Sequence, residues 1–70
     1  MPIVIAPLNV ELKIVKVSTD EKTKKHLQNL GISPEQTLTV IAHNGGNVIV
    51  VCKGVRLALN REVAQKILVA

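Results

Sequence analysis

The segment from Leu27 to Pro34 constrains the fold of this chain more than any other. Leu27 and Leu30 lie three residues apart, so both side chains fall on one face of a helix. Gly31 tolerates the left-handed conformation that ends many helices, and Pro34 prevents the helix from resuming. The segment therefore predicts a helix that ends at a tight corner and leads into a strand. A corner of this kind holds packed elements together and carries no reactive group.

The core of the predicted fold has to be aliphatic. The chain has 70 residues, 47% of them hydrophobic, and it contains no Phe, Tyr or Trp. A domain of this size buries only about 60% of the surface of its unfolded chain, and the Val and Ile residues of this sequence favour strands. We therefore expect a single domain over residues 1–70, mainly β, in the form of a small barrel with one or two short helices.

The first predicted strand contains a change of phase. Apolar and charged residues alternate from Val10 to Ile14, as in a strand with one buried face. Lys16 then takes an apolar position and Val17 a polar one, so a bulge or bend is expected near Val15.

A helix is expected over residues 20–30. Residues 18–21 have the Ser-x-x-Glu form of a capping box that begins at Ser18. The inner face of the helix is expected to consist of Thr23, Leu27 and Leu30. The basic residues Lys22, Lys24 and Lys25 point away from that face. They form either a solvated helix face or a surface that binds a partner.

A hairpin is expected next. Residues 37–42 alternate, with Leu38, Val40 and Ala42 predicted on one side, and the Asn-Gly-Gly-Asn sequence at 44–47 is typical of a two-residue turn.

The strand from Val48 to Cys52 is apolar on both faces. Ile49 and Val51, with Ile41 as a further candidate, are therefore expected to form an outward apolar strip. Alternatively, the helix or the N-terminal segment covers this strip.

The end of the chain predicts three more elements. Lys53-Gly54 indicates a second tight turn, and the alternation over residues 55–59 indicates a strand. Asn60 is expected to cap a short helix over residues 61–66, and residues 67–69 form a last short strand.

The charge of the chain allows several partners but favours none. Nine basic and five acidic residues give a net charge of +4, which permits contact with nucleic acid, anionic lipid or an acidic protein surface. The lack of aromatic residues removes the stacking platform for single-stranded bases and the grooves that bind proline-rich peptides. No nucleic acid is expected as a partner, although a small nucleic-acid-binding barrel stays open as an alternative on charge alone.

Residues that carry chemistry are few and scattered. No metal-ligand spacing, nucleophile elbow or phosphate-binding loop is present, so we predict no catalytic residues and no enzyme. His26, His43 and Cys52 lie on three different predicted elements and are only weak candidates for a metal site. Each has a simpler interpretation, as a helix-border residue, a surface residue and a small buried hydrophobe, respectively.

The same sequence bears on localisation. A single Cys52 forms no intramolecular disulfide, the prolines near the start argue against a signal peptide, and no apolar run is long enough to cross a bilayer. We expect a cytoplasmic protein that meets a membrane only through a partner.

The whole chain resembles the FeoA family, the small ferrous iron transport protein A of bacteria. The resemblance rests on the corner Leu27-x-x-Leu30-Gly31-Ile32-x-Pro34, the strand from Val48 to Val51, and the motifs Gly54-x-x-Leu57-Ala58-Leu59 and Ala64-x-x-Ile67-x-Val69. It implies an Src-homology-3-like (SH3-like) barrel, a fold also found as the C-terminal domain of iron-dependent repressors. This chain departs from the family at Asn9 and Glu35, where glycine is usual, and its hairpin loop at Gly45 and Gly46 lacks a proline often seen there.

The resemblance implies an accessory of FeoB, the membrane transporter of ferrous iron with a cytosolic GTPase region. On this interpretation the protein binds or modulates the transporter through the lysine face or through Ile49 and Val51. A regulatory domain that binds ferrous iron weakly, as a sensor, is the alternative. Weak self-association through the doubly apolar strand is also expected.

Overall fold

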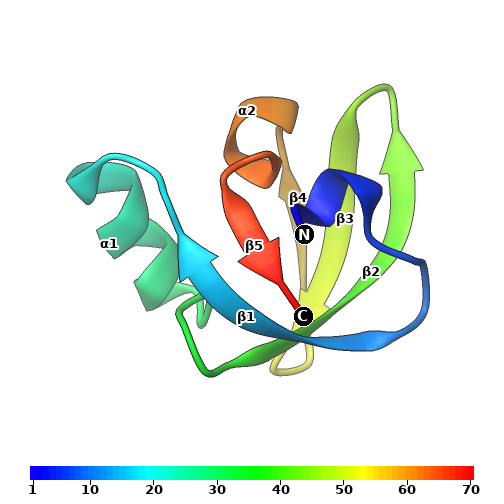
Figure 1. Ribbon diagram of the computed structural model, residues 1–70, viewed down its shortest axis with the longest axis horizontal. Helices are drawn as coiled ribbons and strands as arrows, with labels where there is room; N and C mark the ends of the chain where they lie inside the picture. The colour runs from blue at the N-terminus through cyan, green and yellow to red at the C-terminus, as the bar shows by residue number, and fades with distance from the viewer.

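The five strands of the chain form one antiparallel sheet that curls into a small barrel. The computed structural model describes all of residues 1–70, and the strand order is β4-β3-β2-β1-β5 (Figure 1). The elements are the 3-10 helix η1 (Ile3–Ile5), β1 (Glu11–Val17), α1 (Glu21–Asn29), β2 (Thr37–Asn44), β3 (Asn47–Cys52), β4 (Val55–Leu59), α2 (Arg61–Ala64) and β5 (Ile67–Val69). The predicted mainly β barrel with short helices is confirmed.

Strand β1 bends, so that its two ends pair with different strands. Its first residues, Glu11 to Lys13, pair with β2, and its last residues, Ile14 to Val17, pair with β5. The register with β5 shifts between Ile14 and Lys16, which confirms the bulge expected near Val15. Because a bulge bends and twists its strand, β1 can belong to both halves of the barrel.

Strand β2 contains a second bulge, which the sequence did not indicate. Val40 pairs with Val50 and Ala42 pairs with Ile49, so Ile41 is the extra residue. Opposite residues of an antiparallel pair share a face of the sheet, and Ala42 therefore lies on the outer face with Ile49. The prediction that Ala42 shares the inner face of Val40 was wrong, because the bulge reverses the alternation.

Two-residue turns join β2 to β3 and β3 to β4. The backbone angle φ is 60° at Gly45 and 91° at Gly46, and it is 53° at Lys53 and 76° at Gly54. Positive φ at both central positions is what a type I′ hairpin turn requires. Both predicted hairpins are confirmed.

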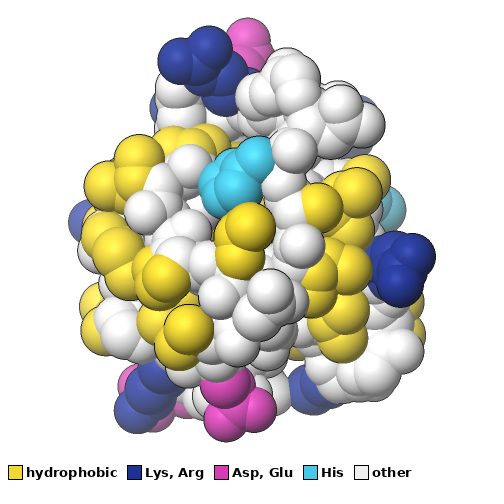
Figure 2. All heavy atoms as spheres, turned by 90° about the vertical axis from the view of Figure 1, so that its right-hand side faces the viewer, with side chains coloured by type: hydrophobic (Ala, Val, Ile, Leu, Met, Phe, Trp, Pro, Cys, Tyr) yellow, Lys and Arg dark blue, Asp and Glu magenta, His cyan; other side chains and the backbone are white.

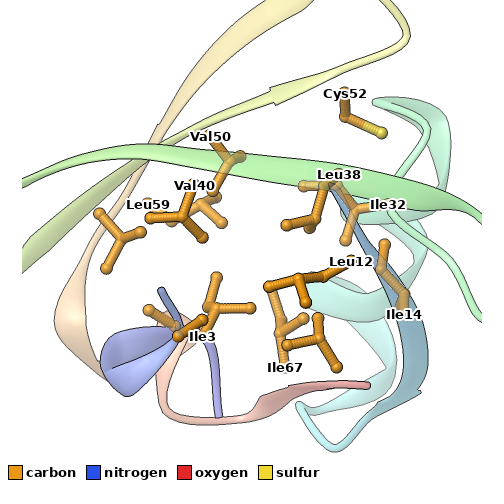
Figure 3. Packing of buried hydrophobic residues seen from close by; sticks show 14 of the residues in the cluster. Ile3, Leu12, Ile14, Ile32, Leu38, Val40, Val50, Cys52, Leu59 and Ile67 are labelled. Carbon is orange, nitrogen blue, oxygen red and sulfur yellow. The ribbon is translucent and has the colours of Figure 1, made fainter. Parts of the chain in front are cut away.

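The core is one cluster of 16 buried residues, all of them hydrophobic, and no polar side chain is buried. Figure 3 shows Ile3 of η1, Leu12 of β1 and Ile67 of β5 pointing into the same interior. Since the largest of these side chains have only four carbons, the core depends on close approach of the backbone elements around it.

The N-terminal segment runs beside β5. The amino group of Met1 donates to the Val69 carbonyl oxygen at 2.9 Å, and the Val69 N–H donates to the Met1 carbonyl oxygen at 2.8 Å. Pro2 forms a further bridge to Leu68, and Ile3 is fully buried. The first residues of the chain are therefore part of the barrel.

Both helices begin at a side-chain cap. The Asp20 carboxylate accepts from the Thr23 N–H at 3.2 Å, and the Asn60 side-chain oxygen accepts from the Val63 N–H at 2.9 Å. The cap predicted at Asn60 is confirmed, although α2 ends at Ala64, earlier than predicted. In α1 the cap is Asp20 instead of Ser18, because the helix begins at Glu21, and a carboxylate at its start is also favoured by the helix dipole.

Helix α1 ends in a Schellman motif at the predicted corner. Gly31 has φ of 95°, its N–H donates to the Gln28 carbonyl at 3.0 Å, and the Ile32 N–H donates to the Leu27 carbonyl at 2.8 Å. Leu27 and Ile32 are both buried in the core. The corner therefore fixes the C-terminal end of α1 against the barrel.

Besides Lys53 in the β3–β4 turn, two residues other than glycine adopt left-handed backbone conformations. The angle φ is 62° at Asn9 and 78° at Glu35. Glu35 is held by its N–H, which donates to the Ile14 carbonyl at 2.9 Å, and by an exposed ion pair of 2.9 Å with Lys13. Of these two residues, Asn tolerates this region better than Glu, so the strain is greater at Glu35.

The Cys52 thiol links β3 to the corner. Its Sγ lies 3.3 Å from the Gly31 carbonyl oxygen and 3.4 Å from the Thr37 carbonyl oxygen, as a weak donor to both. Burial raises the pKa of the Cys52 thiol, and the nearby charge of Lys53 partly opposes this effect. Cys52 thus lies in the core as a protonated thiol, as a small buried hydrophobe would.

We predict that Glu35→Gly is more stable than Glu35→Ala by about 0.5–1 kcal/mol. A left-handed conformation costs a residue with a Cβ about 1–2 kcal/mol, and the greater freedom of unfolded glycine offsets about 0.4–1 kcal/mol of this difference. Both variants lose the ion pair with Lys13, so their difference isolates the backbone. Urea unfolding followed by far-UV circular dichroism measures it, and equal stability of the two variants would contradict the strain at Glu35.

We also predict that the unfolding free energy falls as the pH rises above 9.0, the ordinary pKa of a cysteine thiol. The folded state keeps the Cys52 thiol protonated to higher pH. The contribution of the buried thiol to the free energy of unfolding is therefore complete below the pKa of the thiol in the unfolded chain. It is lost as the pH rises through the higher pKa of the thiol in the folded protein. Urea titrations across this range, on the wild type and on Cys52→Ser, measure the effect. Cys52→Ser should lack the fall in unfolding free energy that the thiol causes. Identical pH profiles of the two proteins would rule out this effect of Cys52.

Candidate interaction site

The predicted basic face of α1 is exposed to solvent. Lys22 and Lys25 are exposed, on the side of the helix opposite the buried Leu27. The expectation that Lys24 also points away was wrong, because Lys24 lies three residues before Leu27, on the same side of the helix, and is half-buried. None of the three lysines forms an ion pair, because the only salt bridge of the chain joins Lys13 to Glu35. The face therefore carries unpaired positive charge, which suits an acidic surface on another molecule.

The predicted apolar strip lies on the outer face of the sheet. Ile49 and Val51 are half-buried and point away from the core, opposite Ala58 and Arg56 of β4. Ala42 of β2, opposite Ile49, extends the strip. The strip is small, and the Arg56 side chain borders it.

The three candidate metal ligands stay on separate elements. His26 is exposed on α1, His43 is exposed near the end of β2, and Cys52 is buried at the end of β3. No group of three or more His, Cys, Asp or Glu side chains lies close enough together to hold a metal ion.

Two shallow grooves cross the surface. The larger, of about 450 Å³, lies between the first turns of α1 and α2 and includes Asp20, Glu62 and Lys66. The pKa of Asp20 is lowered, mainly by the side chain of Thr23 and to a smaller extent by the Thr23 N–H. This carboxylate therefore already caps α1.

The smaller groove, of about 230 Å³, lies between η1, the β2–β3 hairpin and α2. Its lining is Val4, Ile5, His43, Gly46, Arg61 and Gln65. No local sequence pattern predicts either groove, because each forms where segments far apart in the chain meet. His43 was singled out only as a weak metal ligand, and Ile5, Arg61 and Gln65 were not predicted as site residues.

No helix of the fold combines the length and the apolar character that crossing a bilayer takes.

Several solved structures share this fold. An iron uptake regulatory protein (FeoA) matches with a TM-score of 0.86 and 21% identity, over 100% of this chain and 93% of its own. Stenotrophomonas maltophilia FeoA complexed with zinc, a prokaryotic SH3 domain protein, matches with a TM-score of 0.80 and 20% identity, over 100% and 89%. A manganese-dependent transcriptional repressor in complex with manganese matches with a TM-score of 0.88 and 22% identity, over 100% of this chain but 35% of its own.

Identities at this level show the fold alone, and the fold is an SH3-like barrel. A search of curated proteins found no match. The model of the FeoA domain, however, matches residues 1–70, every position of the sequence. The chain therefore belongs to the FeoA domain family, as its corner and strand motifs predicted.

Proposed function

We propose that this protein is a non-catalytic accessory of ferrous iron transport that binds the cytosolic region of a FeoB-type transporter. The observation that carries the proposal is the match of the FeoA domain to the entire chain. The surfaces of the barrel are consistent with a role in protein binding, because they offer unpaired charge and exposed apolar groups instead of a deep pocket.

The basic face of α1 is the preferred contact surface in this proposal. Its lysines project from a helix that the Schellman corner and the buried Leu27 hold in place, so binding would order few groups beyond the lysine side chains. The chain has a net charge of +4, and long-range attraction would guide an acidic partner surface towards it. The outer strip of Ile49 and Val51 is the second surface to test.

The first experiment is an amide-shift titration of the labelled protein with the cytosolic domain of the transporter. We expect shifts on α1 and an affinity that falls about three- to tenfold in the double variant Lys22→Gln/Lys25→Gln, since each exposed ion pair contributes about 0.2–1 kcal/mol. Glutamine is a good helix former, so α1 should persist.

The matched control is Lys16→Gln/Lys66→Gln, which removes the same charge from two exposed positions outside α1. It should retain more of the affinity than the α1 double variant. An equal loss in both would assign the effect to net charge alone, and shifts centred on Ile49 and Val51 would move the contact to the outer strip. The absence of any shift at high micromolar concentration would count against the proposal as a whole.

A metal-responsive sensor is the second candidate function, and the repressor match is the observation that favours it. The separation of His26, His43 and Cys52 weighs against it, because a metal site needs donors that converge.

Anaerobic calorimetry with ferrous iron distinguishes the sensor from the accessory. We expect heats that match dilution into buffer, because no three donor side chains lie together. Saturable binding with a Kd below about 100 μM, weakened in Cys52→Ser or His43→Gln, would favour the sensor instead.

A further inference from the structure

The groove between η1, the β2–β3 hairpin and α2, here called the η1–α2 groove, has a mixed lining that the proposed function does not use. Val4 and Ile5 supply aliphatic surface, and His43, Arg61 and Gln65 supply hydrogen-bonding groups. At about 230 Å³ the groove is smaller than the usual range for small-molecule ligands and of a size for one or two side chains. Figure 2 views this side of the molecule and shows a histidine between hydrophobic side chains at the surface.

The hairpin turn brings Arg61 into place. Gly46 has φ of 91°, and a Cβ at this position would lie 3.4 Å from Cδ of Arg61, so the arginine stem lies directly against the turn. His43 pairs with the buried Val48 and therefore sits at the end of the inner face of the sheet, beside η1. Backbone geometry thus holds two of the polar groups on opposite elements of one groove.

The charge of the groove is unbalanced. Arg61 forms no ion pair, because the single salt bridge of the chain is between Lys13 and Glu35, and no acidic residue lines the groove. The larger groove differs, since Asp20 and Glu62 accompany Lys66 there. Arg61 also occupies the first position of α2, where the helix gains no stability from a basic residue.

The apolar part of the groove is exposed. The Ile5 side chain is 69% accessible, the largest exposed fraction among the large hydrophobic residues of the chain, although neighbouring Ile3 is fully buried. Burial of such a side chain by another molecule is favourable, because each Å² of apolar surface removed from water contributes about 25 cal/mol.

We propose that the η1–α2 groove binds an acidic side chain and an adjacent aliphatic side chain presented by a partner protein. The carboxylate pairs with the Arg61 guanidinium and accepts from a ring N–H of His43, which has at least one such donor in either protonation state. The aliphatic side chain packs on Val4 and Ile5. A nucleic acid fits this lining poorly, since the groove offers aliphatic groups and no aromatic surface for its bases.

This inference goes beyond the contact with the transporter through α1. The groove lies on η1, the hairpin and α2, and none of its lining residues belongs to α1. A test with a short peptide requires no transporter, so the two proposals can fail independently.

The test is a titration of the labelled protein with the capped peptide acetyl-Leu-Glu-Leu-Glu-amide, followed by amide and histidine-ring resonances. We expect saturable shifts at Ile5, Gly46 and Gln65 with a Kd of about 1 mM or below. The His43 ring should shift, and the His26 ring on α1 serves as the internal control. The peptide with Gln in place of Glu should bind at least about tenfold more weakly, because a charge-assisted hydrogen bond is lost.

Two variants separate the polar and apolar parts of the site. Arg61→Gln should weaken binding about tenfold or more, and Ile5→Ser should weaken it several-fold. The control Lys16→Gln removes the same charge from an exposed position of β1, outside both the groove and the lysine face, and should stay within about twofold of the wild type. Ile5 and Arg61 are both exposed, so neither change removes a core contact.

Four results with the peptide would overturn the proposal. These are the absence of saturable shifts, shifts centred on the α1 lysines, equal losses in Arg61→Gln and Lys16→Gln, and equally tight binding of the Gln peptide. Inorganic phosphate is the remaining probe. If phosphate shifts the same resonances with a lower Kd than the peptide, the groove is an anion site for phosphate, and the assignment to a protein segment is wrong.

Discussion

The bend in β1 is the constraint on which the rest of the barrel depends. One strand of seven residues pairs with β2 at its start and with β5 at its end, and the bulge between Ile14 and Lys16 makes the change of partner possible. A straight β1 would leave β5 without a partner, and the N-terminal segment that runs beside β5 would lose its place as well. The bend thus positions η1 and α2, and with them the η1–α2 groove.

Local sequence signals predicted most of the fold because the elements are short and their ends are strongly marked. The corner at Gly31, the glycine-containing turns and the cap at Asn60 each require a particular backbone angle or side-chain oxygen, and the sequence supplies it. The bulge at Ile41 escaped prediction because Ile41 and Ala42 are both apolar, so the change of face leaves no change in the pattern. Ser18 and Asp20 are both capping residues that would start the helix two residues apart, and only the three-dimensional path of the chain decides between them.

The candidate surfaces differ in how far sequence could predict them. The lysine face and the outer strip each lie on one element or on neighbouring strands, so spacing along the chain was sufficient to propose them. The η1–α2 groove combines residues from both ends of the sequence with a hairpin from the middle, and no local pattern contains that information. The result is a barrel with distinct basic, apolar and mixed surfaces, which is the kind of molecule that can serve as an adaptor.

The pairing of Met1 and Pro2 with β5 has a consequence for how the chain folds. The first residues find their hydrogen-bond partners only in the last strand, at a sequence separation of 68 residues for the bond from Met1 to Val69. During synthesis, the aliphatic interior would stay open on one side until β5 is available, because this contact joins residues that are far apart in the sequence. Completion of the core would then wait until β5 has been synthesised, and the two hairpins would be the parts able to form earlier.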